Sequence, residues 1–216
     1  MSDARIVDRI EEVAGRANWV RVVFADGDAM EVPLGAWVDA GARVGGALHP
    51  SVEVVLARAA AVERAKDAAR AYLRARPRTR AQVLAHLARR RVDEAVAREA
   101  VEALEEAGVL DDAAYAQLYT ETQGQRMSRR ELTWRLRRSG VARADVDAAL
   151  ADGPEGRARE RAAALRVARA YMRKHASKPE GLRERLGAHL QRKGFPVPLI
   201  LEILREFDLG GDEPFS

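Results

Sequence analysis

The sequence contains no cysteine, few aromatic residues and no long hydrophobic run. Without cysteine the chain forms no disulfide and offers neither a thiolate metal ligand nor a cysteine nucleophile. None of its apolar runs approaches the roughly 18 residues that a membrane-spanning helix requires. The opening stretch, MSDARIVDRIEEVAG, carries acidic side chains among the apolar ones and differs from a secretory signal. We therefore expect a cytoplasmic protein without a membrane segment.

Charged residues and good helix formers are abundant. Charged residues make up 32% and hydrophobic residues 47% of the 216 residues, proportions typical of a soluble globular protein. The net charge is +4 but is unevenly distributed, since residues 1–64 carry −3 and residues 157–216 carry +5. Only four of the 37 basic residues are lysine. Whatever the origin of that bias, the planar guanidinium of arginine suits bidentate contacts to carboxylates and phosphates.

The first 60 residues are predicted to form a small module of their own. Ile6, Ile10 and Val13 have the spacing of one helix face and predict a helix over residues 3–14. The sequence then changes to a different periodicity, so a different kind of structure is expected to follow.

A β-hairpin is expected after this helix. Apolar side chains alternate over residues 20–24 and 30–34, and Asp26–Gly27 between them is a strong turn signal. Two strands alone are marginally stable, so we expect the hairpin to pack on helices or to find a third strand. The glycines of residues 35–50 indicate a short helical turn and loops, and no strand is expected from Ser51 onward.

Three later segments share one pattern: an apolar residue, a leucine four positions on, a basic residue two after that and an apolar residue three further on. They are VLAHLARRRV from Val83, LTWRLRRSGV from Leu132 and LGAHLQRKGF from Leu186. Each follows a helical stretch that carries a tyrosine and precedes another amphipathic stretch. A unit of three helices in about 50 residues therefore occurs three times.

The expected fold is mainly α (α+β overall), a small strand module followed by three tandem three-helix repeats. Units of this size are marginal alone, so the repeats should stack along the chain into an elongated, curved, solenoid-like body. The predicted segments are an N-terminal helix and β-hairpin module at 1–60, repeats at 61–110, 111–156 and 157–209, and a flexible tail at 210–216.

The runs ARPRTRAQVLAHLARRRV, LEEAGVLDDAAYAQLY and SRRELTWRLRRSGV resemble the RecX family of recombination regulators. The most specific piece is the junction Gly108–Asp112 followed by Tyr115–Ala116. The hairpin region is similar to an N-terminal extension found in some members. One departure is Arg91, which stands where the other repeats have Gly140 and Gly194 and predicts a different cap at this helix end.

The resemblance extends over residues 60–208 and implies a non-enzymatic regulator of homologous recombination and DNA repair. Family members are similar in binding the RecA–DNA filament along its helical groove and inhibiting its growth, ATP hydrolysis and strand exchange. We expect a monomer without cofactor, whose contacts to single- or double-stranded DNA are weak and salt-sensitive. Each phosphate contacted would lower DNA affinity by roughly 0.7–0.9 log unit per log unit of salt.

The candidate partner- and DNA-binding residues are basic side chains at equivalent helix ends, together with one tryptophan. They are Arg89, Arg90, Arg126, Arg129, Arg130, Trp134, Arg135, Arg137, Arg138, Arg192 and Lys193. The alternative for the cations is a solvated helix face with local ion pairs. Trp134 either packs in a core or between repeats, or is exposed and stacks on a base or anchors a protein interface. The recurring tyrosines, Tyr72, Tyr119 and Tyr171, are interpreted as core residues.

No motif of catalysis or metal binding is present. The four histidines lack metalloprotease spacing, and neither a nucleophile elbow nor a Walker loop is found. His86 and His189 occupy the repeat position of Arg135, which favours a polar surface position. Asp111 and Asp112 precede a helix and are expected to cap it. We therefore predict no catalytic residue, no metal site and no cofactor.

The main alternative is a direct DNA-binding transcriptional regulator of the helix–turn–helix type. Residues 79–104 have the right size for that motif, and ARRRV supplies cations for a DNA groove. However, basic residues are spread over three units, and acidic residues are nearly as numerous, 33 against 37. A helical scaffold that binds no nucleic acid is a third interpretation.

Overall fold

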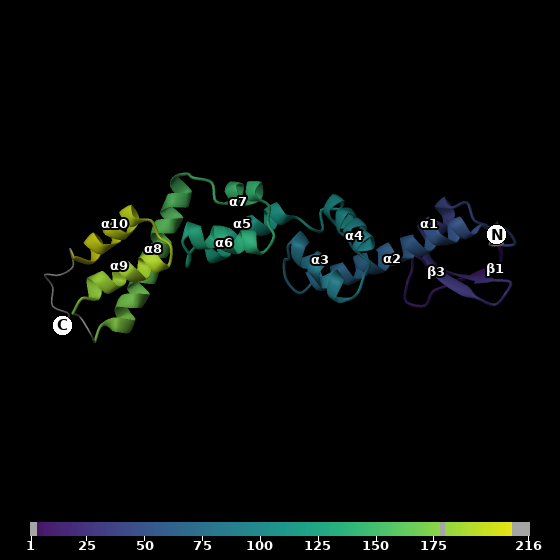
Figure 1. The fold of residues 1–216 in the computed structure, drawn as a ribbon, viewed down its shortest axis with the longest axis horizontal. Coiled ribbons are helices and arrows are strands. Elements are labelled where there is room, and N and C mark those ends of the chain that lie inside the picture. The colour runs from purple at the N-terminus through teal and green to yellow at the C-terminus, as the bar shows by residue number, and fades with distance from the viewer. Residues whose placement is uncertain (1–3, 178–179, 209–216) are drawn as a thin grey trace. The chain divides into compact units, whose positions relative to one another are not determined.

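The computed structural model describes residues 4–177 and 180–208 (Figure 1). The tail expected at 210–216 lies outside them. The chain divides into two units. The first contains the residues up to Pro77 together with Val83–Leu110, and the second contains Arg78–Gln82 together with the residues from Asp111 on. The elements are β1 (Arg5–Glu12), β2 (Trp19–Phe24), β3 (Ala29–Pro33), α1 (Leu34–Asp39), β4 (Ala47–Leu48), α2 (Pro50–Leu73), α3 (Arg80–Arg89), α4 (Glu94–Glu106), α5 (Asp112–Gln123), α6 (Arg129–Arg138), α7 (Arg143–Ala149), α8 (Pro154–His175), α9 (Leu182–Arg192) and α10 (Val197–Asp208).

The first unit begins with an antiparallel sheet in the order β3-β2-β1-β4. The predicted hairpin is present as β2 and β3, and in its turn the Phe24 N–H donates to the Asp28 carbonyl at 2.8 Å. Val22 and Phe24 of β2 are buried with Val32 of β3 against Leu56 of α2. The hairpin thus finds both a third strand and a helix, as expected.

The helix predicted over residues 3–14 is wrong, because β1 occupies this stretch. Val7 pairs with Phe24 and is 1% exposed, whereas Ile6 and Ile10 are 47% and 40% exposed. The free edge of β2 therefore decides the structure: pairing with it buries Val7 and satisfies the backbone of both strands, which outweighs the local helical spacing. The two-residue strand β4, which pairs with the start of β1, was also not expected.

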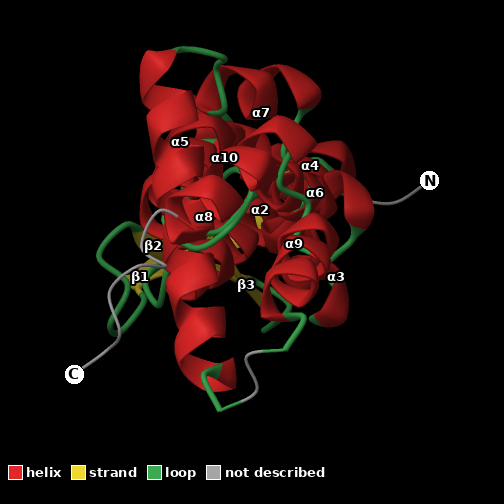
Figure 2. Ribbon diagram, turned by 90° about the vertical axis from the view of Figure 1, so that its left-hand side faces the viewer, coloured by secondary structure: helices red, strands yellow, loops and turns green. Residues whose placement is uncertain are grey.

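Helix α2 belongs to two cores of the first unit. Its beginning places Leu56 in the core of the strand module, and its later turns place Ala65 and Ala69 in a core with α3 and α4 (Figure 1). Residue 60, the predicted end of the N-terminal module, lies inside this helix. From Ser51 on, the described residues form helices and connections without a strand, as Figure 2 shows.

The second unit contains two helical cores. One is formed by α5, α6 and α7 around Leu132 and Leu136, the other by α8, α9 and α10 around Leu186 and Leu190. The central leucines of the three repeats, Leu87, Leu136 and Leu190, are all fully buried. The fold is therefore mainly helical with a small N-terminal strand module. The elongated, curved arrangement of the repeats stays a prediction.

Helix ends meet in the same way twice within the second unit. Thr79, just before α3, donates from Oγ1 to the carbonyl of Ser139 at 2.5 Å. Ser128, the N-cap of α6, donates from Oγ to the carbonyl of Lys193 at 2.7 Å. Counted from the central leucines, Thr79 is equivalent to Ser128 and Ser139 is equivalent to Lys193. The sequence repeat is thus accompanied by a repeated contact.

The first repeat does not end its middle helix differently, contrary to the prediction from Arg91. Arg91 has φ +59°, and the equivalent Gly140 and Gly194 have φ +90° and +84°. In all three turns the next residue donates its N–H to the carbonyl of the central leucine at 3.2 Å, the bond of a Schellman motif. The backbone geometry is shared, and only the residue that adopts it differs.

Candidate partner-binding surface

Helix α6 carries most of the predicted contact residues because its two faces differ. Leu132 and Leu136 are buried, and the remaining positions are largely basic. Ser128 accepts from the Glu131 N–H at 3.2 Å at the start of the helix, and the basic residues of the last turn complement the negative end of the helix dipole. The sequence thus fixes a short amphipathic helix whose outer face is cationic.

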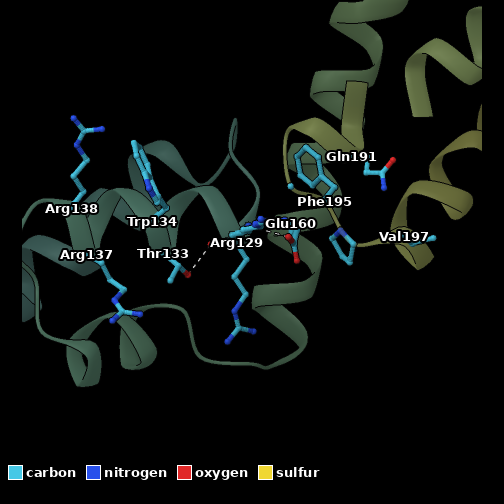
Figure 3. A pocket seen from close by; sticks show the side chains of 12 residues that line it. Arg129, Thr133, Trp134, Arg137, Arg138, Glu160, Gln191, Phe195 and Val197 are labelled. Atoms are coloured by element: carbon cyan, nitrogen blue, oxygen red, sulfur yellow. Dashed lines mark hydrogen bonds between the residues drawn. The ribbon is translucent and has the colours of Figure 1, made fainter. Parts of the chain in front are cut away.

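An open groove of about 1030 Å³ lies beside α6, facing the connection between α9 and α10 (Figure 3). We call it the Trp134 groove. It is lined by Arg129, Arg130, Thr133, Trp134, Arg137, Arg138, Glu160, Gln191 and Gly194–Val197. In Figure 3, Trp134 and Arg138 project to one side of α6, and Arg129 and Arg137 project to the other. Cations therefore border the groove on two sides.

Trp134 and Val197 are the exposed apolar side chains of this groove, each 55% exposed. The interpretation of Trp134 as a core residue is thus wrong, since its position on α6 points away from Leu132 and Leu136. Phe195 lines the groove with little exposure, because it also packs into the core around Leu190. The centre of the groove is apolar although its borders are charged.

The arginines of the groove differ in their local partners. The Arg129 guanidinium lies 3.2 Å from Asp152, and its backbone N–H donates to Glu160 at 3.0 Å. The Arg138 guanidinium lies over the Trp134 ring at 5.0 Å from the centroid. Within residues 4–177 and 180–208, Arg130 and Arg137 form no ion pair.

Arg135 points elsewhere. Its guanidinium contacts Tyr119 and pairs with Glu131 at 2.8 Å, and these partners raise its pKa. Its charge is therefore largely compensated within the repeat. Arg130 and Arg137 are the groove cations most available to an anionic partner.

The structure brings some of the other predicted residues to the same surface. Arg192 and Lys193, at the end of α9, line a second hollow of about 630 Å³ together with Arg130 and Trp134. Arg126 is exposed in the turn between α5 and α6 and lines neither hollow. Arg89 and Arg90 are exposed at the end of α3 in the first unit and line neither hollow.

The apolar side of the groove was missed from the sequence. The repeat pattern includes Phe195, but it predicts no groove and does not extend to Pro196 and Val197. The available signal was an apolar triplet directly after Arg192–Lys193. Its place in the same groove as Trp134 depends on how two repeats pack together, which local periodicity does not contain.

The repeated tyrosines pack against the cores, as predicted, and each touches the same repeat position on the middle helix. Tyr72 stacks on His86 at 4.0 Å between ring centroids, and Tyr171 stacks on His189 at 4.5 Å. Burial and the nearby Lys193 lower the pKa of His189. No group of three or more His, Asp or Glu side chains able to hold a metal ion is found in the described part of the chain.

Of the two aspartates at the junction of the first two repeats, Asp111 caps α5, as predicted, whereas Asp112 lies in the first turn of α5 and caps the start of α3 instead. Asp111 accepts from the Ala114 N–H at 2.9 Å, and Asp112 accepts from the Arg80 N–H at 2.7 Å, at the start of α3. Burial raises the pKa of Asp112. Among the described helices, none is long and apolar enough to cross a membrane.

No protein-family model matches the chain. In solved structures, the fold is similar to a crystal structure of regulatory protein RecX, with a TM-score of 0.80 and 20% identity over 94% of this chain and 99% of that one. RecX from Lactobacillus salivarius has a TM-score of 0.60 and 20% identity, covering 69% of this chain and 97% of its own. At such identities these likenesses show the shared fold.

Curated relatives are closer in sequence. The regulatory protein RecX of Streptomyces coelicolor is 31% identical over 147 residues, which cover 67% of this chain and 78% of that protein. The regulatory protein RecX of Thermus thermophilus is 38% identical over 127 residues, covering 59% of this chain and 80% of its own length. The resemblance noted in the sequence is thus confirmed, and the chain belongs to the RecX family of regulatory proteins.

Proposed function

We propose that this protein regulates homologous recombination and DNA repair by binding the RecA–DNA filament and inhibiting its growth, ATP hydrolysis and strand exchange. The relatives compared above are named regulatory proteins, which supports a regulatory role. The observation that carries the proposal is the Trp134 groove. Its exposed tryptophan and its available arginines, Arg130 and Arg137, form a surface suited to an anionic macromolecule.

The proposed mechanism is occupation of the filament surface, without bond making by the protein. A bound monomer covers surface that the next RecA subunit or a second DNA strand requires, so growth and exchange both slow. Electrostatic attraction between the basic helix ends and an acidic or phosphate-rich surface would speed association and make it sensitive to salt. We place this activity in the cytoplasm.

Each of the three repeats, proposed at 61–110, 111–156 and 157–209, contributes one basic helix end. The first contributes Arg89 and Arg90. The second contributes the basic residues of α6 and the exposed Arg126, and the third contributes Arg192 and Lys193. No observation favours the helix–turn–helix alternative.

The direct test adds increasing amounts of the full chain to RecA-driven strand exchange and to DNA-dependent ATP hydrolysis by RecA. A gel shift on naked duplex DNA is run beside it at the same salt concentrations. The proposal expects both RecA activities to fall at protein concentrations that leave naked duplex mostly unshifted. Tight, sequence-dependent binding to duplex without any effect on RecA would contradict it.

A further inference from the structure

We infer that the Trp134 groove takes an acidic protein segment that places one apolar side chain against Trp134. This assignment rests on the proposed function and deepens it, because it states which component of the filament the groove contacts. The occupant is protein, and its chemistry is an apolar anchor flanked by carboxylates.

The apolar part of the occupant follows from the lining of the groove. Trp134 and Val197 are each 55% exposed and line the same groove toward its opposite ends, with Phe195 between them (Figure 3). Exposed large apolar side chains that share one hollow are characteristic of the centre of a protein interface, where tryptophan and arginine are enriched. An apolar side chain entering beside Trp134 would remove the exposed surface of this ring from water.

The acidic part of the occupant follows from the cations at the border. Arg130 and Arg137 form no ion pair within the described residues, and Arg138 lies over the Trp134 ring. Guanidinium groups bind carboxylates in a bidentate manner, and such bonds are strongest next to apolar surface that excludes water. Carboxylates on either side of the apolar anchor would therefore meet arginines on both borders of the groove.

Nucleic acid fits the same groove less well. Binding of single strands uses successive exposed aromatic rings as stacking platforms and an uninterrupted cationic track for phosphates. Here Trp134 is a single exposed ring, because Phe195, the other aromatic side chain of the lining, is only 4% exposed. Glu160 lines the groove itself, and Asp152 lies beside Arg129. These carboxylates interrupt the continuous cationic track that a phosphate backbone would follow.

The test exploits the absence of cysteine from the chain. Val197→Cys introduces a unique thiol in the groove, which is labelled with a benzophenone maleimide. The labelled full chain is bound to RecA filaments on radiolabelled single-stranded DNA and illuminated. The expected adduct is a RecA peptide rich in Asp and Glu, and adding Trp134→Ala should lower its yield roughly tenfold. A matched label at Leu118→Cys, on α5 and 45% exposed, should give a lower yield of that peptide.

Two outcomes overturn the inference while leaving the proposed function in place: adducts from position 197 to DNA, or RecA adducts from position 118 alone. In contrast, labelled and unlabelled chains that neither sediment with filaments nor inhibit strand exchange would overturn the proposed function, and the inference with it.

A label-free measurement covers the case in which the label itself blocks the groove. Trp19 and Trp37 are buried, so Trp134 is the solvent-exposed fluorophore of the three. A 12-residue peptide of Asp and Glu with one central Leu should shift the Trp134 emission to shorter wavelength. The same peptide with Gly in place of Leu should require a higher concentration for the same shift. Equal responses to both peptides, or a response to oligo-dT alone, would reject the apolar anchor.

Discussion

The end of α3 and the ends of α6 and α9 share one backbone turn but differ in what lies against it. At Gly140 a Cβ would collide with the Cβ of Ala81, and at Gly194 it would lie 3.0 Å from the Ser128 hydroxyl. Arg91 adopts the same left-handed conformation and is exposed. The glycines are therefore required by close approach of another helix, in addition to the positive φ.

The residues at the starts of α3, α6 and α9 also differ between the repeats. Thr79 and Ser128 have hydroxyls that reach the end of the following middle helix, whereas the equivalent position of the third repeat is Leu182. The hydroxyl residues Thr79 and Ser128 each contact the repeat that follows them in the sequence. The glycines Gly140 and Gly194 each lie against the repeat that precedes them. Both kinds of residue are thus determined by the neighbouring repeat and not by the helix that carries them.

The largest expected effect comes from Gly140→Ala. The substitution forces a left-handed conformation on alanine and drives its Cβ into Ala81, so it should lower the free energy of unfolding by roughly 3 kcal/mol. Chemical denaturation followed by circular dichroism measures this loss.

Arg91→Gly is the matched control for the same turn without the crowding. Glycine removes the strain of an arginine in the left-handed conformation, but it also raises the conformational entropy of the unfolded chain. These two effects oppose each other, so the free energy of unfolding should change by no more than about 1 kcal/mol. A loss for Gly140→Ala no larger than the gain for Arg91→Gly would show that the turn alone, and not the close approach, selects glycine.

Removal of the hydroxyl contact should have the next largest effect. Ser128→Ala deletes both the cap of α6 and the bond to the Lys193 carbonyl, at a fully buried position, and should cost about 2 kcal/mol in stability. Ser139→Ala is the control, because Ser139 contributes its backbone carbonyl to the equivalent contact, and should change stability by less than about 0.5 kcal/mol. Thermal and denaturant unfolding of the two variants distinguish these outcomes.

These contacts also show what the sequence can and cannot predict. The shared spacing puts Leu87, Leu136 and Leu190 on one helix face with the apolar residue four positions earlier, and all three are buried, because one helix face is a local property. The same rule failed for Ile6 and Ile10, where pairing with a distant strand decides the structure.

The candidate site divides in the same way. The basic residues of α6 follow from one run of sequence, so that half of the surface was predictable. Its apolar half, Phe195–Val197, belongs to a segment some 60 residues later, and only the fold places it beside Trp134. Burial of Phe195 was predictable from the repeat pattern, whereas its place in a groove was not.

A charge-reversal experiment tests whether the basic ends of α3 and α6 contribute differently to inhibition. The double variant Arg137→Glu/Arg138→Glu places two acids on the Trp134 groove and should raise the concentration needed for half-inhibition of strand exchange roughly tenfold. The control is the double variant Arg89→Glu/Arg90→Glu at the end of α3, where Ala85 stands at the position that corresponds to Trp134. It should raise the concentration needed for half-inhibition less than about threefold.

Both variants keep the buried leucines, so circular dichroism should show unchanged folding. Equal inhibition by the folded Arg137/Arg138 variant and the unmodified chain would remove these two residues from the contact surface. Equal losses for both variants would instead assign binding to basic charge in general.

The smallest effect concerns His189, which stacks on Tyr171 in the third repeat and is surrounded by cations. Burial, with Lys193, Arg192, His175 and Lys174, lowers its pKa below the ordinary 6.5, so the folded chain binds this proton less readily than the unfolded chain. The stability contributed by neutral His189 is therefore present above pH 6.5 and is lost as the pH falls through the lowered pKa. Replacement by Gln should make the free energy of unfolding less dependent on pH between 7.5 and 5. An unchanged pH dependence in His189→Gln would show that protonation of this ring does not oppose folding of the third repeat.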